Sequence, residues 1–336
     1  MPEAQVVPIN RDEPDRCRAV TVRGQPCRNR AVEGSMFCRI HQPSSGSRAP
    51  TGGLPPSLGS LAEGDVTDIF EFLRRRMRGE YEIDVFGFDR ELTELLLPLI
   101  RPLVRSYFRV DVIGNERIPS TGPALLAANH AGTIPLDGVV LRGVVWEHEP
   151  HRHVRELVAD LGFTIPFFSQ VVRKTGATVA CVEDTMRLLK AGELVAVFPE
   201  GFKGVGKRFK ERYRLQRFGR GGFVEVAMQA RAPIVPVAIV GSEETYPMVA
   251  NLRPLARLLG LPYFPITAQF PLLGPLGLLP IPSKWVIEFC EPVETAHLPE
   301  DAASDPMAVF EVTDQVRQSI QRTLLKNLRL RRSILG

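Results

Sequence analysis

Two short apolar runs in this chain of 336 residues each end in a compact polar motif. Residues 124–128 lead into Asn129-His130, and residues 194–198 lead into Pro199-Glu200-Gly201. Runs of this length and composition are typical of buried strands. Because open α/β sheets assemble their functional sites at strand ends, we expect both motifs to lie at the functional edge of a sheet.

From residue 110 onwards, strand-like apolar runs alternate with helical patterns. Further strands are expected at 110–113, 178–181, 234–240 and 285–290, and helices at 135–145, 183–190 and 222–229. Asp305 and Pro306 then predict a capped helix whose apolar residues keep helical spacing. This alternation predicts an α/β fold with a central sheet flanked by helices.

Changes in composition divide the chain into six segments. A stretch rich in Ser, Gly and Pro predicts a flexible linker between a basic, cysteine-containing segment and the rest of the chain. Helical spacing downstream of it predicts two helices, the first with a basic face. The predicted segments are a disordered tail at 1–16, a Cys/His module at 17–42, the linker at 43–60, N-terminal helices at 61–109, the α/β domain at 110–300, and a C-terminal helix with a basic tail at 301–336.

The Cys/His module holds three cysteines and one histidine within 25 residues, namely Cys17, Cys27, Cys38 and His41. Three thiolates and one imidazole complete a tetrahedral shell, so we expect a structural zinc ion here. The segment also resembles small treble-clef-like or knuckle-like Cys-Cys-Cys-His modules. The alternative is a disordered basic tail with incidental cysteines. The other two cysteines lie in separate apolar stretches, which predicts core packing and no disulfide framework.

Charge and hydropathy limit the classes of partner. A net charge of +4 with 24% charged residues does not by itself indicate nucleic-acid binding, and no nucleic-acid partner is expected. The first 30 residues are polar and show no secretory signal, which predicts a cytoplasmic protein. Residues 258–283 carry no charge, but six prolines exclude a spanning helix. We therefore expect no transmembrane helix and an apolar surface segment that contacts a membrane or lipid.

His130 and Asp137 are the candidate catalytic pair. A histidine with a nearby carboxylate can act as a general base whose ring the acid orients. On a continuous helix the two residues would lie about 10 Å apart, so a contact between them requires a loop, which Gly132 and Pro135 favour. The alternative for Asp137 is a first-turn acid stabilised by the helix dipole.

Four motifs in order resemble those of the glycerolipid acyltransferase superfamily of PlsC type, over residues 84–292. They are Asn129-His130 with Asp137, residues 176–181, Phe198-Pro199-Glu200-Gly201, and residues 234–237. The resemblance implies a mixed central sheet and transfer of an acyl group from acyl-CoA or acyl carrier protein to a hydroxyl. It makes His130 the base and Asp137 its orienting acid, and it requires no catalytic metal.

The resemblance also implies a site for the acceptor. Glu200 would bond hydroxyls of a glycerol-like moiety, and the residues of the first and third motifs that would line the site are Asn129, Gly132, Thr133, Phe198, Pro199 and Gly201.

The sequence departs from the family pattern in two places. Six residues rather than four separate His130 from Asp137. The second motif ends in Cys181-Val182 where the family has an Asp-Arg pair that helps to bind phosphate. Phosphate binding then requires other cations, and the candidates are Arg173, Lys174, Lys203 and Lys207. The alternative for the last two is a solvated basic loop.

Three functional hypotheses follow. The first is an acyltransferase for a lysophospholipid or related glycerolipid, peripheral on the inner face of the cell membrane. The second is an acyltransferase for a neutral acceptor such as a monoacylglycerol, diacylglycerol or glycolipid, which the missing arginine favours. The third is a zinc-dependent binding protein with an inactive acyltransferase-like domain, supported by the Cys/His module alone.

Overall fold

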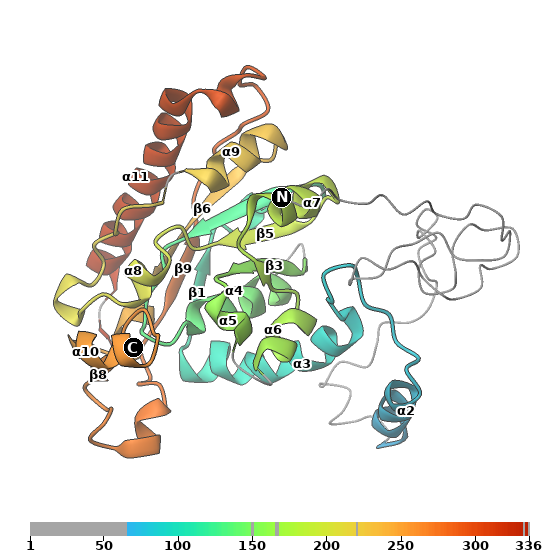
Figure 1. The fold of residues 1–336 in the computed structure, drawn as a ribbon, viewed down its shortest axis with the longest axis vertical. Coiled ribbons are helices and arrows are strands. Elements are labelled where there is room, and N and C mark those ends of the chain that lie inside the picture. The colour runs from blue at the N-terminus through green and yellow to red at the C-terminus, as the bar shows by residue number, and fades with distance from the viewer. Residues whose placement is uncertain (1–65, 149–150, 165–167, 220, 332, 335–336) are drawn as a thin grey trace, which may run out of the picture. The chain divides into compact units, whose positions relative to one another are not determined.

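A seven-stranded sheet forms the centre of the computed structural model, which describes residues 66–148, 151–164, 168–219, 221–331 and 333–334 (Figure 1). The strands lie in the order β1-β9-β6-β2-β5-β3-β4. All neighbouring strands are parallel except β6 and β9, so the predicted mixed sheet is confirmed. The strands are β1 Asp111–Ile113, β2 Ala124–Ala128, β3 Val154–Val158, β4 Thr178–Val179, β5 Leu194–Val197, β6 Ile234–Val240 and β9 Val286–Phe289.

Helices cover both faces of this sheet. The α-helices are α2 Val66–Met77, α3 Arg90–Pro102, α4 Leu136–Glu147, α5 Leu161–Thr164, α6 Phe168–Lys174, α7 Val182–Lys190, α8 Phe202–Val205, α9 Gly222–Gln229, α10 Arg253–Leu258 and α11 Pro306–Leu330. The shorter helical turns are η1 Leu103–Tyr107, η2 Asn115–Arg117, η3 Phe209–Glu211, η4 Ser242–Glu244, η5 Gly274–Leu278 and η6 Ala302–Ser304.

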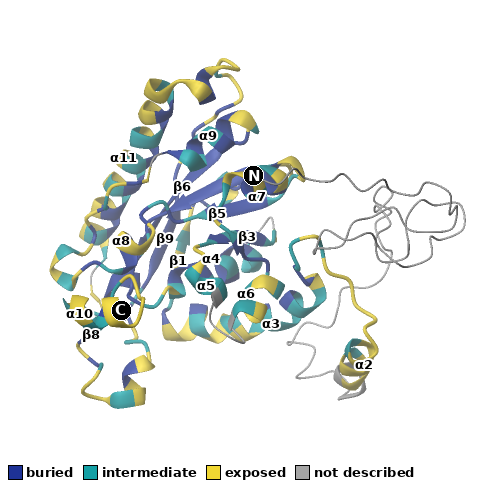
Figure 2. Ribbon diagram, viewed as in Figure 1, coloured by how far each residue is buried: buried dark blue, intermediate teal, exposed yellow. Residues whose placement is uncertain are grey.

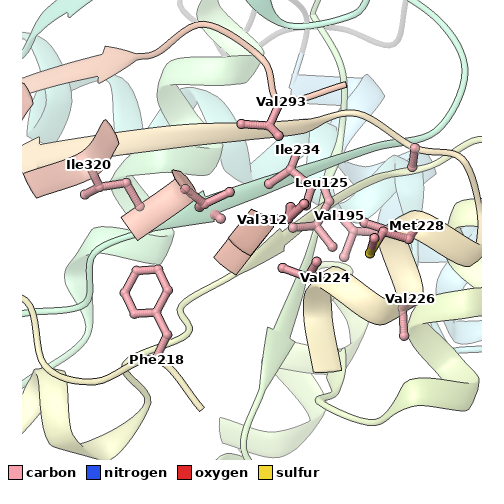
Figure 3. Close-up of a cluster of buried hydrophobic side chains, with 14 of the residues drawn as sticks. Leu125, Val195, Phe218, Val224, Val226, Met228, Ile234, Val293, Val312 and Ile320 are labelled. Carbon is pink, nitrogen blue, oxygen red and sulfur yellow. The ribbon is translucent and has the colours of Figure 1, made fainter. Parts of the chain in front are cut away.

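Strand β2 is buried on both sides, which explains its unbroken apolar sequence. Leu125 and Ala127 point into a core that α7, α9 and α11 help to build, as Figure 3 shows for part of it. The alternate residues, including Leu126, pack with α3 and α4 on the other face. Figure 2 shows the resulting buried sheet under a more exposed layer of helices.

Strand β3 is absent from the elements expected from sequence because Arg155 and Glu156 interrupt its apolar pattern. Both charged side chains are nevertheless enclosed. Arg155 forms ion pairs with Asp84 at 2.7 Å and Glu193 at 3.3 Å. A buried charge needs such partners, and here they lie far from β3 in the sequence.

The apolar segment at 258–283 follows α10 and contains β8 (Pro265–Thr267) and η5. Strand β8 pairs antiparallel with β7 (Met248–Asn251) in a separate two-stranded sheet. Many leucines of the segment are exposed, including Leu258 at 81% and Leu272 at 84%. Among the helices that the structure describes, none is both long and apolar enough to cross a membrane.

Candidate active site

The loop after β2 folds Asp137 back onto His130. Gly132 and Thr133 both have positive φ, at 95° and 62°, and they reverse the chain before α4 begins. A Cβ atom on Gly132 would lie 2.7 Å from the carbonyl oxygen of Ser242, so this turn requires glycine. Asp137 Oδ2 lies 2.8 Å from His130 Nδ1 and accepts the Ala131 amide at 2.9 Å. The loop contact expected from sequence is therefore present.

The imidazole of His130 is enclosed and oriented. Its ring packs against Phe198 with 4.4 Å between centroids, and 13% of its side chain is exposed. Because Nδ1 faces the Asp137 carboxylate, Nε2 is the ring atom left to act as a base. Burial lowers the pKa of His130, but the carboxylates of Asp137, Glu156 and Glu200 outweigh it and raise the pKa above the ordinary value.

Glu200 follows β5 and supports the main chain of His130. Its Oε1 accepts the His130 amide at 3.0 Å, and its Oε2 accepts the Gln216 amide at 2.6 Å. The side chain has no exposed surface. Both Glu200 oxygens thus accept bonds from the protein backbone, and binding of acceptor hydroxyls by Glu200 stays a prediction.

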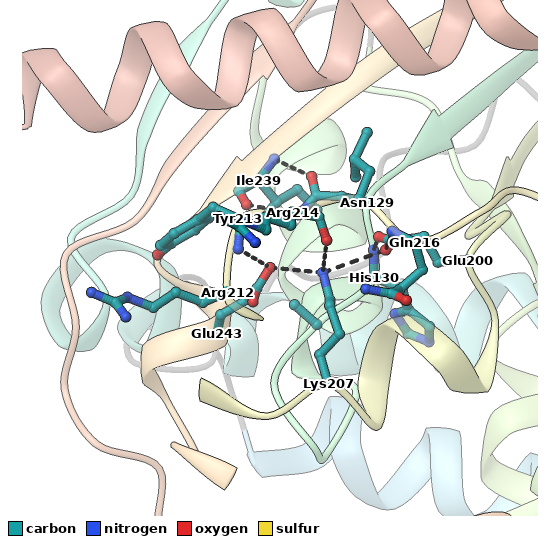
Figure 4. Close-up of polar contacts among 12 residues, drawn as sticks. Asn129, His130, Glu200, Lys207, Arg212, Tyr213, Arg214, Gln216, Ile239 and Glu243 are labelled. Carbon is teal, nitrogen blue, oxygen red and sulfur yellow. Dashed lines mark hydrogen bonds and ion pairs between the residues drawn. The ribbon is translucent and has the colours of Figure 1, made fainter. Parts of the chain in front are cut away.

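Lys207 lies between two buried carboxylates (Figure 4). Its Nζ is 3.0 Å from Glu243 Oε1 and 3.4 Å from Glu200 Oε2, and it donates to the carbonyl oxygen of Arg214 at 3.3 Å. Its side chain is 3% exposed. Lys207 is therefore paired within the protein, and its binding of a substrate phosphate stays a prediction. Lys203, by contrast, is exposed on α8.

The remaining expected residues of the first motif have structural contacts. The Asn129 side chain donates to Ile239 O at 3.0 Å and accepts from Ile239 N at 2.7 Å, which joins the end of β2 to β6. Thr133 Oγ1 donates to Tyr246 O at 3.1 Å. Asn129 and Thr133 are both buried, so they shape the loop around His130.

Arg173 and Lys174 end α6, and their cations lie over aromatic rings. Arg173 lies 5.2 Å from the centroid of Phe163, and Lys174 lies 5.3 Å from that of Tyr81. These contacts join α6 to α5 and to the segment after α2, rather than to the His130 loop. The structure therefore does not place Arg173 and Lys174 beside His130, the candidate base.

The backbone of the third motif also shapes the surroundings of His130. Pro199 O accepts the Gly219 amide at 3.3 Å. Gly201, with φ of 54°, starts the turn into α8. That turn carries Gly204 to His130, where a Cβ atom on Gly204 would lie 2.6 Å from the His130 carbonyl oxygen.

The structure adds site residues that sequence reasoning missed. Glu156 on β3 packs against Gly138, where a Cβ atom would lie 2.2 Å from its Oε1. Burial raises the pKa of Glu156. Tyr263 donates its hydroxyl to Thr133 O at 2.6 Å, and burial raises its pKa to about 12. Glu243 was missed as well. Sequence signals for the two acids exist: Glu156 lies beside Arg155 between apolar residues, and Glu243 follows directly after the apolar strand β6.

The proposed zinc ligands Cys17, Cys27, Cys38 and His41 lie outside the described residues. Within the part of the chain that the structure describes, no group of three or more His, Cys, Asp or Glu residues could hold a metal ion.

Comparison with known proteins identifies the family of the domain that contains these residues. The model of the acyltransferase family matches residues 109–240. Uncharacterized proteins of Mycobacterium bovis and Mycobacterium leprae are similar to the chain. The first is 52% identical over 297 residues, 88% of this chain and 82% of that protein, and the second 54% over 279 residues, 82% and 76%.

More distant similarities cover less or are weaker. The human protein named DGAT1/2-independent enzyme synthesizing storage lipids is 30% identical over 165 residues, which span 48% of this chain and half of that protein. The crystal structure of the 1-acyl-sn-glycerophosphate acyltransferase PlsC from Thermotoga maritima aligns with a TM-score of 0.47 and 18% identity, over 76% of this chain and 89% of that one.

The residues that the family model matches contain the His130–Asp137 pair and the buried Glu200, so the candidate catalytic pair and its support lie within one recognised domain. Residues 109–240 belong to the acyltransferase family, and the chain is an acyltransferase.

Proposed function

We propose that this acyltransferase moves a fatty acyl group from acyl-CoA or acyl carrier protein to a hydroxyl of a lysophospholipid or related glycerolipid. The observation that carries the proposal is the 2.8 Å contact between His130 Nδ1 and Asp137 Oδ2 at the end of β2. An alcohol is a weak nucleophile at neutral pH, and a positioned imidazole typically accelerates its reaction by about 10² to 10⁴.

The reaction then proceeds by direct transfer. His130 Nε2 takes the proton of the acceptor hydroxyl as its oxygen attacks the thioester carbonyl carbon. The carbon–sulfur bond breaks, and the His130 imidazolium returns its proton to the departing thiolate, which leaves as the free thiol while His130 becomes neutral again. Asp137 stabilises the imidazolium that exists between the two proton transfers. The intact pair also argues against an inactive domain.

A neutral acceptor is the second candidate. Three of the four cations expected to bind phosphate contact other parts of the protein: Lys207 pairs with Glu200 and Glu243, while Arg173 and Lys174 lie over aromatic rings. Lys203 is exposed. The name of the human relative, which refers to synthesis of storage lipids, agrees with an acceptor such as a monoacylglycerol or diacylglycerol.

The test is transfer of labelled acyl groups from acyl-CoA and acyl carrier protein to a panel of acceptors with and without phosphate. His130→Ala should lower kcat by about 10²-fold or more. His297, an exposed histidine far along the chain, offers the matched control His297→Ala, which should keep full activity. Equal rates for the wild type and His130→Ala would exclude the proposed base.

We further propose that the enzyme binds a membrane surface through the exposed leucines of α10 and the segment that follows it. This leucine surface comprises Leu258, Leu259, Leu261, Leu272, Leu273, Leu276, Leu278 and Leu279. The sequence from 245 to 287 contains no acidic residue but includes Arg253, Arg257 and Lys284. Exposed leucines flanked by cations suit an anionic lipid interface. Tyr263, in the same segment, contacts the His130 loop.

Sedimentation with phosphatidylglycerol vesicles tests the leucine surface. The double variant Leu272→Ser/Leu276→Ser should weaken binding by at least about tenfold, because each leucine withdrawn from water contributes on the order of 1–2 kcal/mol. Leu325→Ser/Leu330→Ser removes comparably exposed leucines from α11 and should leave binding unchanged. Equal losses in both double variants would contradict a specific docking surface.

A further inference from the structure

Three charged side chains from separate parts of the chain meet beside the main chain of His130 in an interior cluster (Figure 4). Glu200 follows β5, Lys207 follows α8, and Glu243 lies in η4 just after β6. Their side chains are 0%, 3% and 5% exposed. We call this group the buried triad. The Lys207 ammonium lies between the two carboxylates and contacts both.

The two carboxylates of the buried triad bind the backbone as well as Lys207. Glu200 accepts the amides of His130 and Gln216, and Glu243 Oε1 accepts the Tyr213 amide at 3.0 Å. Lys207 also donates to Arg214 O. The triad therefore ties residues 213–216 and the end of β6 to the amide of the candidate base.

Stability alone does not account for such a group. Desolvating a charge costs several kcal/mol, and replacement of a buried ion group by apolar residues is often neutral or stabilising. The distinguishing feature of this triad is that one of its hydrogen bonds ends on His130. Two other residues hold His130 as well. Asp137 contacts the ring, and Gly204 lies close to the carbonyl oxygen of His130.

We propose that Lys207 and Glu243 are positioning residues for the acyl transfer reaction, and that they fix the main chain of His130 through Glu200. The inference rests on the proposed role of His130 as the base. Lys207 contacts both carboxylates and compensates the repulsion between them, so Glu200 stays in place to accept the His130 amide. Without Lys207 the two buried carboxylates repel each other, and the support of His130 weakens.

Kinetics of the full chain test this inference with Lys207→Met, which removes the charge and keeps the length of the side chain. We expect kcat to fall by about tenfold to a hundredfold, since a displacement of about 1 Å in a catalytic group can cost that much, while KM changes less than about twofold. The double variant Lys207→Met/Glu243→Gln again leaves a single negative charge in the cluster. It should recover about tenfold of the lost kcat, a coupling that a double-mutant cycle measures.

Arg331→Met is the matched control. Arg331 pairs with Glu244, the neighbour of Glu243 in η4, and the two side chains are 7% and 4% exposed. This variant breaks an equally buried pair that makes no contact with Glu200, so the folded enzyme should keep its kcat. If Lys207→Met does not fold, Glu243→Gln alone should lower kcat, because Lys207 and the Tyr213 amide then lose the carboxylate that holds them beside Glu200.

Three outcomes would overturn the inference. They are an unchanged kcat in folded Lys207→Met, a rise in KM without a fall in kcat, and an equal loss of kcat in Arg331→Met. The amide resonance of His130 in an NMR spectrum provides a readout that does not need turnover, and it should shift in Lys207→Met but not in Arg331→Met. If the wild type transfers no acyl group to any acceptor, the proposed function fails, while this resonance still decides whether the triad positions His130.

Discussion

His130 is held at three points of its own structure. Asp137 contacts ring atom Nδ1, Glu200 accepts the amide, and Phe198 packs against the ring face. The ring therefore has little freedom to turn, and Nε2 has a defined direction. Such preorganisation reduces the entropy lost when a reacting hydroxyl is brought to the base.

The raised pKa of His130 predicts the pH dependence of the enzyme. A base must be unprotonated, so kcat/KM should fall as the pH decreases through a value above about 6.5, the ordinary histidine pKa. Asp137→Asn removes the largest influence that raises this pKa, so the acidic limb of the profile should move to lower pH. The plateau of kcat should also drop by about 10²-fold or more, because an amide stabilises the imidazolium less. An acidic limb that stays in place would contradict the pairing.

Gly204 should tolerate no side chain. Its Cβ atom would lie 2.6 Å from the His130 carbonyl oxygen and 3.0 Å from His130 Cβ, so Gly204→Ala must displace the base. We expect kcat to fall by about tenfold or more. Gly222→Ala in α9 is the control, because a Cβ atom there meets nothing within 4 Å. That variant should keep full activity and gain up to about 1 kcal/mol of stability. Equal activities in the two variants would exclude tight packing at His130.

At the scale of elements, the agreement between sequence and structure depends on how each strand is buried. Strands β2 and β6 begin and end at the expected residues, because both are apolar throughout, follow a proline, and end before Asn129 and Gly241. Strand β3 was missed because the partners of Arg155 and Glu156 come from other elements. The short helices α5, α6, α8 and α10 were also missed, since elements of four to seven residues show too little periodicity.

The N-cap of the last helix, Asp305, yields a stability prediction. Asp305 accepts the Met307 amide at 2.9 Å and so satisfies one free donor at the start of α11. Asp305→Ala should cost about 1 kcal/mol and lower Tm by about 2 °C. Asp301 is the matched control, since it precedes η6 without a side-chain capping bond, and Asp301→Ala should leave Tm unchanged. Activity should be the same in both variants, because neither residue contacts the His130 loop.

At the scale of the whole molecule, strand order brings the two motifs together. Strands β2 and β5 are parallel neighbours, with Ala127 opposite Val197, so both motifs leave the same edge of the sheet. Strand β6 lies on the other side of β2 and brings Glu243 to the same place. The active site thus depends on three strands that are separated in sequence by many residues.

The chain divides into two units, residues 1–54 and 55–336, and the proposed catalytic pair lies in the second. We expect the protein without residues 1–60 to keep its acyl transfer rate, because His130 and its contacts come from residues after 110.

We also expect the full chain to bind zinc through Cys17, Cys27, Cys38 and His41. Elemental analysis should detect zinc in the wild type and its loss in Cys27→Ser, with transfer retained. If chelation of zinc abolishes acyl transfer while residues 61–336 stay folded, a purely structural role for the zinc ion is contradicted.

The sequence by itself determined the secondary elements that are apolar throughout and the contact between His130 and Asp137. Both depend on short-range features: hydrophobic periodicity, and a glycine that lets the six residues between His130 and Asp137 close a loop. The tertiary structure alone decided which charges are buried together. Glu200 turns inward to the His130 amide, and Lys207 pairs with Glu243, 36 residues further along the chain. The physical reason is that a buried charge must find its partner across neighbouring strands, and strand order is set by packing of the whole sheet.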